Sequence, residues 1–219
     1  MKNSYQNLSL LQNLYKLRAM GFSYIDHFSC NNQKSTIEPN NLYELQTTLQ
    51  NCHLCDLSKS RSQTMSGFGQ EKADLMILDY TVSTIQDSTN DYYPGRSGEI
   101  LKNMIEKVIG ISLEQTYYTH AIKCKPLHSK KPSLSEWNSC KNHLYMQIRF
   151  IQPKVIMVLG EETYKILMDD ESNFENVRGH SISFQNTTLV PLYHPLHLLR
   201  NPHLKKTTLS DLQVVKRYL

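Results

Sequence analysis

Short apolar runs alternate with longer amphipathic segments along most of the chain. Four runs suit buried strands, and they span residues 75–78, 116–119, 155–159 and 189–193. Helical spacing of apolar positions is found between and after them, at 98–109, 135–151, 161–168 and 209–219. This alternation predicts a three-layer α/β/α fold with a four-stranded, mostly parallel central sheet.

Local signals and a change of composition refine these boundaries. Ser133, followed by Glu136, has the spacing of a capping box, and Ser97 with Gly98 is a second helix-start signal. Residues 5–20 place leucines at helical spacing, whereas the polar run up to residue 41 contains a proline and predicts a linker. We therefore expect a helical extension and linker over residues 1–41 and the main domain over residues 42–219.

Polar side chains follow each predicted strand. In parallel sheets, functional groups gather just beyond the carboxyl ends of the strands. The candidates at these ends are Asp79, Tyr80, His120, Gly160, Glu161 and His194. Any one of these histidines taken alone is more often a hydrogen-bonded or solvated side chain than a catalytic group.

Composition narrows the class of protein. Hydrophobic residues make up 39% and charged residues 20% of the 219 residues, and no apolar run approaches the roughly 20 residues that span a bilayer. The N-terminus lacks the continuous apolar segment of a signal peptide, so we expect a soluble, cytoplasmic monomer without a membrane partner. A net charge of +4 is compatible with a polyanionic partner but does not establish one.

The five cysteines predict a metal or cluster site. Cys52 and Cys55 form a C-x2-C pair, Cys124 and Cys140 are widely spaced, and Cys30 is left over. An odd number of thiols without an export signal argues against a disulfide framework. Four thiolates suit zinc or an iron–sulfur cluster, and buried structural thiols are the alternative. The spacing alone leaves zinc and iron–sulfur open.

Several ordered motifs resemble one family. They are CHLC at 52–55, GFG at 67–69, YYPGRSGEIL at 92–101, YYTHAIKCKP at 117–126, Cys140, PKVIMVLG at 153–160, VRGH at 177–180 and YHPLHLLRNP at 193–202. Together they resemble the family 4 uracil-DNA glycosylases, the 4Fe-4S members of the uracil-DNA glycosylase-like superfamily. The resemblance implies that Cys52, Cys55, Cys124 and Cys140 hold a structural 4Fe-4S cluster.

The resemblance also assigns roles in base flipping and cleavage. His194 matches the histidine that stabilises the leaving base, and Leu198 matches the wedge that fills the gap left by the flipped nucleotide. An ordinary core leucine is the alternative for Leu198. Tyr93 matches an aromatic side chain that stacks on the flipped base. Arg200 and the lysines after it are expected to hold phosphates, although a solvated basic stretch would contain the same residues.

Two positions depart from the family. Tyr80 stands where the family has a Glu in a Gly-rich turn, so we expect Asp79, or less favourably Asp87 or Asp91, to orient the water. His120 stands where the family has the Asn that reads uracil, and an imidazole offers its donor and acceptor in different directions. Strict uracil selectivity is therefore in question.

The leading hypothesis is a DNA glycosylase of base excision repair that removes uracil or a related damaged base from single- or double-stranded DNA. The alternatives are a 4Fe-4S DNA-binding relative that is inactive or altered in specificity, and a zinc-stabilised interaction module.

Overall fold

The computed structural model describes residues 15, 16, 18, 38–127 and 130–219. Contacts divide the chain after Glu38, and the account below concerns the unit from Pro39 to Leu219. The expected helix over residues 5–20 lies outside the described residues except at Tyr15, Lys16 and Arg18, which are helical. The linker before residue 38 and Cys30 also lie outside them, so the division at residue 41 stays a prediction.

A six-stranded sheet forms the centre of this unit, with the strand order β1-β3-β2-β4-β6-β5. The strands are β1 (Phe68–Gly69), β2 (Leu75–Thr81), β3 (Thr116–Ile122), β4 (Val155–Leu159), β5 (Ile182–Phe184) and β6 (Thr187–Leu192). The four inner strands are parallel, and short antiparallel strands β1 and β5 are added at the edges. The predicted four parallel strands are confirmed, because such strands are buried on both faces and read as continuous apolar runs.

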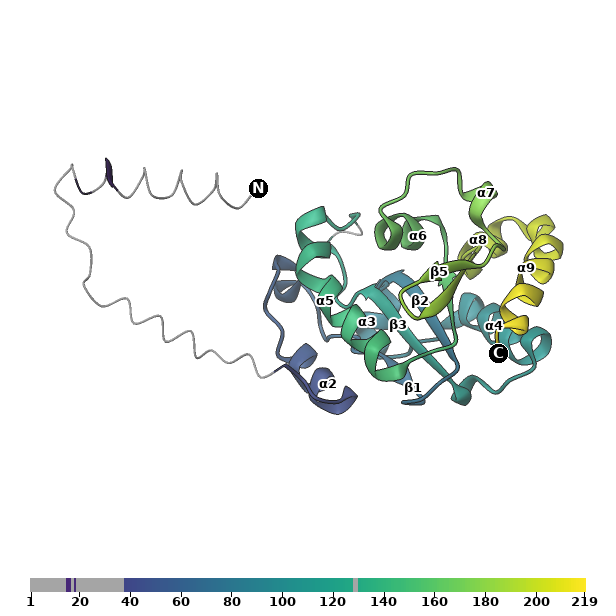
Figure 1. Ribbon diagram of the computed structural model, residues 1–219, viewed down its shortest axis with the longest axis horizontal. Coiled ribbons are helices and arrows are strands. Elements are labelled where there is room, and N and C mark those ends of the chain that lie inside the picture. Colours follow the sequence, from purple (N-terminus) through teal and green to yellow (C-terminus); the bar gives the residue numbers. More distant parts are fainter. Residues whose placement is uncertain (1–14, 17, 19–37, 128–129) are drawn as a thin grey trace. The chain divides into compact units, whose positions relative to one another are not determined.

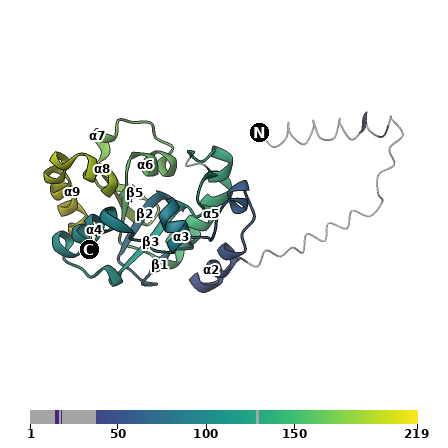
Figure 2. The same cartoon turned by 180° about the vertical axis from the view of Figure 1, so that it is seen from behind.

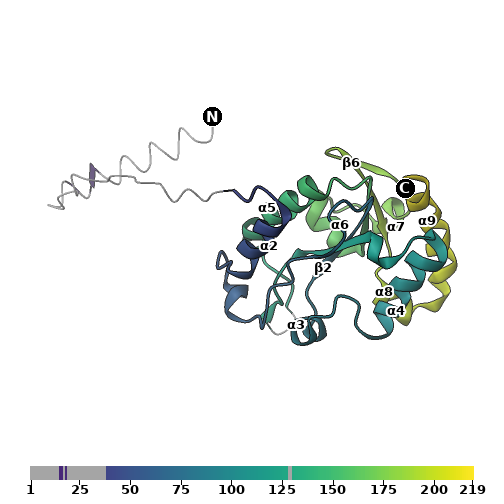
Figure 3. The same cartoon turned by 90° about the horizontal axis from the view of Figure 1, so that it is seen from below.

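Helices cover both faces of the sheet. They are α2 (Leu42–Gln50), α3 (Thr84–Thr89), α4 (Gly95–Asn103), α5 (Leu134–Ile151), α6 (Glu161–Met168), α7 (Phe174–Val177), α8 (Pro195–Arg200) and α9 (Lys205–Arg217). Helices α2 and α5 lie on one side, and α4, α8 and α9 on the other, as the view from below shows (Figure 3). Helix α4 contacts α8, and the two opposite views show α4, α8 and α9 at the same end of the unit (Figure 1 and Figure 2). The predicted three-layer class is confirmed.

Helix boundaries follow the local chemistry. The capping box of Ser133 and Glu136 is present at the start of α5. The start expected at Ser97 is wrong: α4 begins at Gly95, directly after the N-cap Pro94, whose fixed φ suits the entry to a helix. The second half of the expected helix 98–109 is a π-helical turn, Met104–Ile109.

A tight turn precedes the first buried residue of α4. A Cβ atom on Gly98 would lie 1.9 Å from the carbonyl oxygen of Tyr93, so only glycine fits this close approach. The turn therefore fixes the direction in which Tyr92 and Tyr93 leave the backbone. None of the described helices is both long and apolar enough to cross a membrane.

Candidate functional site

A cavity of about 540 Å³ lies where the carboxyl ends of the parallel strands meet. Its walls come from the ends of β2, β4 and β6, from Tyr118 on β3, and from the starts of α3, α4, α6, α7 and α8. The residues that matter below are Asp79, Tyr80, Gln86, Tyr92, Tyr118, Glu161, Glu162, Glu175, His194 and Leu196. The predicted strand-end groups therefore largely converge on one cavity, with His120 as the exception.

His194 is fixed by contacts on both ring nitrogens. It is the N-cap of α8, and its Nδ1 accepts the backbone N–H of Leu196 at 3.0 Å. Its Nε2 lies 3.3 Å from each carboxylate oxygen of Asp79. The His194 side chain remains 32% exposed, so it faces the cavity.

Asp79 lies on the cavity floor and is contacted there by three neighbouring groups, one of which is His194. Its Oδ1 accepts the backbone N–H of Tyr80 at 2.7 Å, and its Oδ2 accepts the hydroxyl of Tyr118 at 2.6 Å. Burial raises the pKa of Asp79, but His194 and the Tyr118 hydroxyl lower it by more, so the net pKa is well below the ordinary range. Asp79 is therefore a carboxylate at neutral pH.

The protonation state of His194 is set by two opposing neighbours. Burial lowers the pKa of His194, while the charge and hydrogen bond of Asp79 raise it above its ordinary value. The backbone N–H of Leu196 donates to the lone pair of Nδ1, and this hydrogen bond would be lost if Nδ1 were protonated. The Leu196 contact, at 3.0 Å, is shorter than the 3.3 Å contact between Nε2 and Asp79. We therefore assign a neutral imidazole with its proton on Nε2, facing Asp79.

Tyr80, at the position of the family's Glu, also lines the cavity. Burial raises the pKa of its hydroxyl, and the charge of Glu162 raises it further. Tyr80 thus supplies a neutral aromatic ring and a backbone N–H to the site, and it provides no carboxylate.

His120 lies beneath the cavity wall and does not line the cavity. It is 0% exposed, and neither ring nitrogen has a hydrogen-bond partner. Its ring packs edge-on against Tyr118 and lies 6.2 Å from the ring of Tyr92. Burial lowers the pKa of His120 to about 4, so the ring is neutral at pH 7. In this arrangement His120 cannot contact a base in the cavity.

The two adjacent tyrosines take different roles in the packing. Tyr93, expected to stack on the base, packs edge-on against Tyr118 and is not part of the cavity wall. Tyr92 lines the cavity instead, and its ring stacks on Phe68 at 5.6 Å. Its hydroxyl accepts the backbone N–H of Gly67.

The leucine expected to act as a wedge is buried. Leu198 is 2% exposed and belongs to the hydrophobic core, so it presents no surface to DNA. The residue on the outer face of α8 is Leu196, which is 43% exposed and lines the cavity beside His194. Arg200, at the end of the same helix, is exposed as expected.

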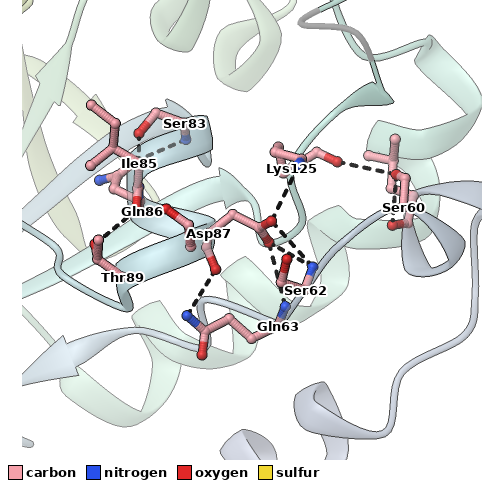
Figure 4. Close-up of polar contacts among 11 residues, drawn as sticks. Ser60, Ser62, Gln63, Ser83, Ile85, Gln86, Asp87, Thr89 and Lys125 are labelled. Atoms are coloured by element: carbon pink, nitrogen blue, oxygen red, sulfur yellow. Dashed lines mark hydrogen bonds and ion pairs between the residues drawn. The ribbon is translucent and has the colours of Figure 1, made fainter.

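The other acidic candidates for water orientation point elsewhere. Asp87 is buried and accepts the backbone N–H of Ser62 at 3.0 Å, while Lys125 lies 3.3 Å from its Oδ2 (Figure 4). Asp91 is exposed and accepts the backbone N–H of Tyr93. Neither carboxylate lines the cavity.

Helix α3 contacts the cavity wall with one residue and the segment after Cys55 with the next. The side chain of Gln86 accepts the backbone N–H of Ser83 and donates to the carbonyl of Tyr92, both on the cavity wall. The next residue, Asp87, binds the segment that follows Cys55 (Figure 4).

The four cysteines expected to bind a cluster are free thiols that interact with one another. Burial raises the pKa of Cys140 to about 11, and the neighbouring Cys124 and Cys52 raise it as well. The pKa of Cys124 is raised by burial and by Cys55 and Cys52. The four sulfur atoms therefore belong to one region of the fold, although they come from three separate segments.

Cations surround this region. Arg61 donates to the sulfur of Cys124 at 3.1 Å and to the carbonyl of Cys52 at 2.8 Å. The buried Lys123 lowers the pKa of Cys140. Positive charge lowers the pKa of a thiol, but burial outweighs it here and the pKa values of Cys124 and Cys140 stay raised. What fits a thiolate-bound group is the set of four sulfur donors itself. Among the described residues, no three His, Cys, Asp or Glu side chains are grouped closely enough to hold one metal ion.

Sequence reasoning missed three parts of the cavity wall. Glu162 and Glu175 line it, with Glu162 2.6 Å from Lys131 and Glu175 bound by Arg178. Glu162 is next to the predicted Glu161, but nothing in the sequence marks Glu175. Tyr92 was within a quoted motif, and only its neighbour received a role.

Comparison with known proteins places this fold and cavity in a family. A model of the uracil DNA glycosylase superfamily matches residues 66–213, and the chain belongs to this superfamily. It is 28% identical over 173 residues to the Type-4 uracil-DNA glycosylase of Sulfurisphaera tokodaii, covering 75% of this chain and 79% of that protein. It is 27% identical over 187 residues to the Type-4 uracil-DNA glycosylase of Saccharolobus solfataricus, covering 82% and 87% respectively. The resemblance predicted from the motifs is confirmed.

Proposed function

We propose that this protein is a DNA glycosylase of base excision repair that hydrolyses the N-glycosidic bond of uracil in DNA. The superfamily match over residues 66–213 is the observation that carries this proposal. Curated relatives named as Type-4 uracil-DNA glycosylases favour it over a DNA-binding relative without activity.

His194 is the group that we assign to the leaving base. As the bond from C1′ to N1 breaks, its electron pair stays with the base and negative charge builds on the base oxygen. His194 lies on the cavity wall, and its Nε2–H, which faces Asp79 in the free protein, can be shared with that oxygen when a base is bound. Water adds its oxygen to C1′, and its proton neutralises the base.

Two surface side chains are assigned to the DNA. Leu196 replaces the buried Leu198 as the wedge, because it is exposed at the cavity rim next to His194. Apolar side chains of this kind enter a base stack and hold it open. Arg200 follows on the same helix and is assigned to a phosphate.

Cys52, Cys55, Cys124 and Cys140 are assigned to a 4Fe-4S cluster. Their influence on one another's pKa and the guanidinium of Arg61 on the Cys124 sulfur support this assignment. The cluster would hold the three cysteine-bearing segments together and takes no part in bond cleavage. Protein purified under nitrogen should be brown and contain iron, and Cys140→Ser should lose both while Cys30→Ser keeps them. A colourless, iron-free wild type would refute the cluster.

The activity is tested with labelled oligonucleotides that carry one uracil, hypoxanthine or xanthine. The expected result is alkali-sensitive breakage at uracil, with a loss of about 10²- to 10³-fold in His194→Ala. The matched control is His203→Ala, whose imidazole is exposed and outside the cavity. Absence of breakage at every lesion would refute the glycosylase.

A further inference from the structure

The loss of the family's Asn leaves the reading of the base unassigned. Its replacement, His120, is fully buried and does not line the cavity. A base in the cavity must therefore be recognised by polar groups of the cavity wall itself. On the floor, the carboxylate of Asp79 stands directly beside the imidazole of His194.

The Asp79 carboxylate has hydrogen-bonding capacity to spare. Its two oxygens offer about four acceptor sites. The N–H of Tyr80 and the hydroxyl of Tyr118 take two of them, and Nε2–H of His194 takes a third at 3.3 Å. One acceptor site is therefore left for a ligand.

Asp79 and His194 thus present an acceptor and a donor next to each other. We propose that this pair reads the base, with Asp79 accepting the N3–H of uracil while His194 Nε2–H donates to the adjacent base oxygen. The inference rests on the proposed function and deepens it, because it names the recognised chemical class. That class is a base with a ring N–H next to the carbonyl oxygen that receives negative charge.

The same pair rejects cytosine. With the cytosine oxygen on His194, the adjacent ring nitrogen presents a lone pair to the Asp79 carboxylate, and two acceptors repel. Asp79 stays ionised because its pKa is lowered, so it supplies no proton to relieve the repulsion. A methyl group on N3 of uracil removes the donor, places carbon against the remaining acceptor site of the buried carboxylate and leaves that site without a partner. Sites built on such polar groups discriminate strongly against analogues that lack them.

The substrate side of the test uses the full-length wild-type protein. Single-turnover cleavage is compared for oligonucleotides that contain deoxyuridine, N3-methyldeoxyuridine or deoxycytidine. We expect the N3-methyl and cytosine substrates to react at least about 100-fold more slowly than uracil. Equal rates for uracil and N3-methyluracil would overturn the proposal.

The protein side uses substitutions at position 79. In Asp79→Ala, the ratio of the uracil rate to the N3-methyluracil rate should fall below about 10, because the acceptor is gone. Asp79→Asn keeps a carbonyl acceptor and should recover most of the ratio. The matched control is Asp74→Ala, which removes an exposed carboxylate paired with Lys154 and should keep the wild-type ratio. An unchanged ratio in folded Asp79→Ala would count against the proposal.

Binding of free bases separates this inference from the proposed function. Uracil, N3-methyluracil and cytosine are titrated into the full-length protein, and the imidazole signals of His194 are followed by nuclear magnetic resonance. Uracil should bind, and the other two should bind at least tenfold more weakly. This outcome would support base reading by Asp79 and His194 even if no DNA were cleaved. Equal binding of all three, or binding of none, would refute it.

Discussion

Removal of the Asp87 carboxylate should destabilise the fold without touching the cavity lining. This side chain is almost fully buried on α3 and accepts the backbone N–H groups of Ser62 and Gln63. In Asp87→Ala the stronger of these donors, Ser62 N–H, loses a charged acceptor in a part-buried contact, and a hydrogen bond to a charged group contributes about 1.5–3 kcal/mol, less where water can replace it. The Gln63 contact is long at 3.4 Å and adds less.

Lys125 contributes little to this cost, because its side chain is 26% exposed and water can solvate the charge. We therefore expect Asp87→Ala to lower the free energy of unfolding by about 1–3 kcal/mol. Asp87→Asn keeps one acceptor oxygen and should cost about 1 kcal/mol. Urea unfolding followed by circular dichroism measures both. A loss below about 0.5 kcal/mol in Asp87→Ala, as for an ordinary surface substitution, would refute this reasoning.

The effect should also depend on pH. Burial raises the pKa of Asp87, but the hydrogen bonds from Ser62 and Gln63 and the nearby Lys125 lower it by more. Because the pKa is lower in the folded chain, this stabilisation is fully present above the ordinary carboxyl pKa of about 4 and is lost as the pH falls below it. The difference between wild type and Asp87→Asn should therefore shrink on acidification. A difference that stays constant down to pH 3 would contradict the assigned ionisation.

Three further substitutions test the surface assigned to DNA. Leu196→Ala should slow uracil excision from duplex DNA without lowering the melting temperature, whereas Leu198→Ala should lower the free energy of unfolding by about 2–5 kcal/mol; the reverse pattern in thermal melts and kinetics would restore Leu198 as the wedge. Arg200→Ala should reduce the slope of log binding constant against log salt concentration by about 1, measured by fluorescence anisotropy, and an unchanged slope would remove Arg200 from the interface.

Much of the sheet could be predicted because its inner strands have a simple signature. A strand covered on both faces is apolar over most of its length, so the pattern located β4 and β6 to within two residues. It ended β2 and β3 three residues too early, because Asp79, Tyr80 and His120 are polar positions inside these strands. Asp79 and His194 directly follow the predicted apolar runs, and they lie 3.3 Å apart in the structure. Strands β1 and β5 have two and three residues and lie at the edges, where no such pattern is required.

The remainder depended on the direction of individual side chains. Tyr92 and Tyr93 are adjacent, and only their packing, Tyr92 on Phe68 and Tyr93 on Tyr118, shows which of them reaches the cavity. Leu196 and Leu198 lie on one short helix, and the position of its N-cap at His194 sets which leucine faces the core. His120 was expected just after its strand but lies within β3, where it is fully buried and packs edge-on against Tyr118. Tertiary packing determines each of these outcomes.

Helix α3 is only six residues long, yet Gln86 and Asp87 attach it to two different regions. If the segment after Cys55 moved, Asp87 would move with it, and the adjacent Gln86 would shift the backbone of Tyr92. The sheet would not have to change. Oxidation of the thiols during storage should therefore first weaken binding of the base in the cavity. The circular dichroism spectrum of the strands should still be normal at that stage.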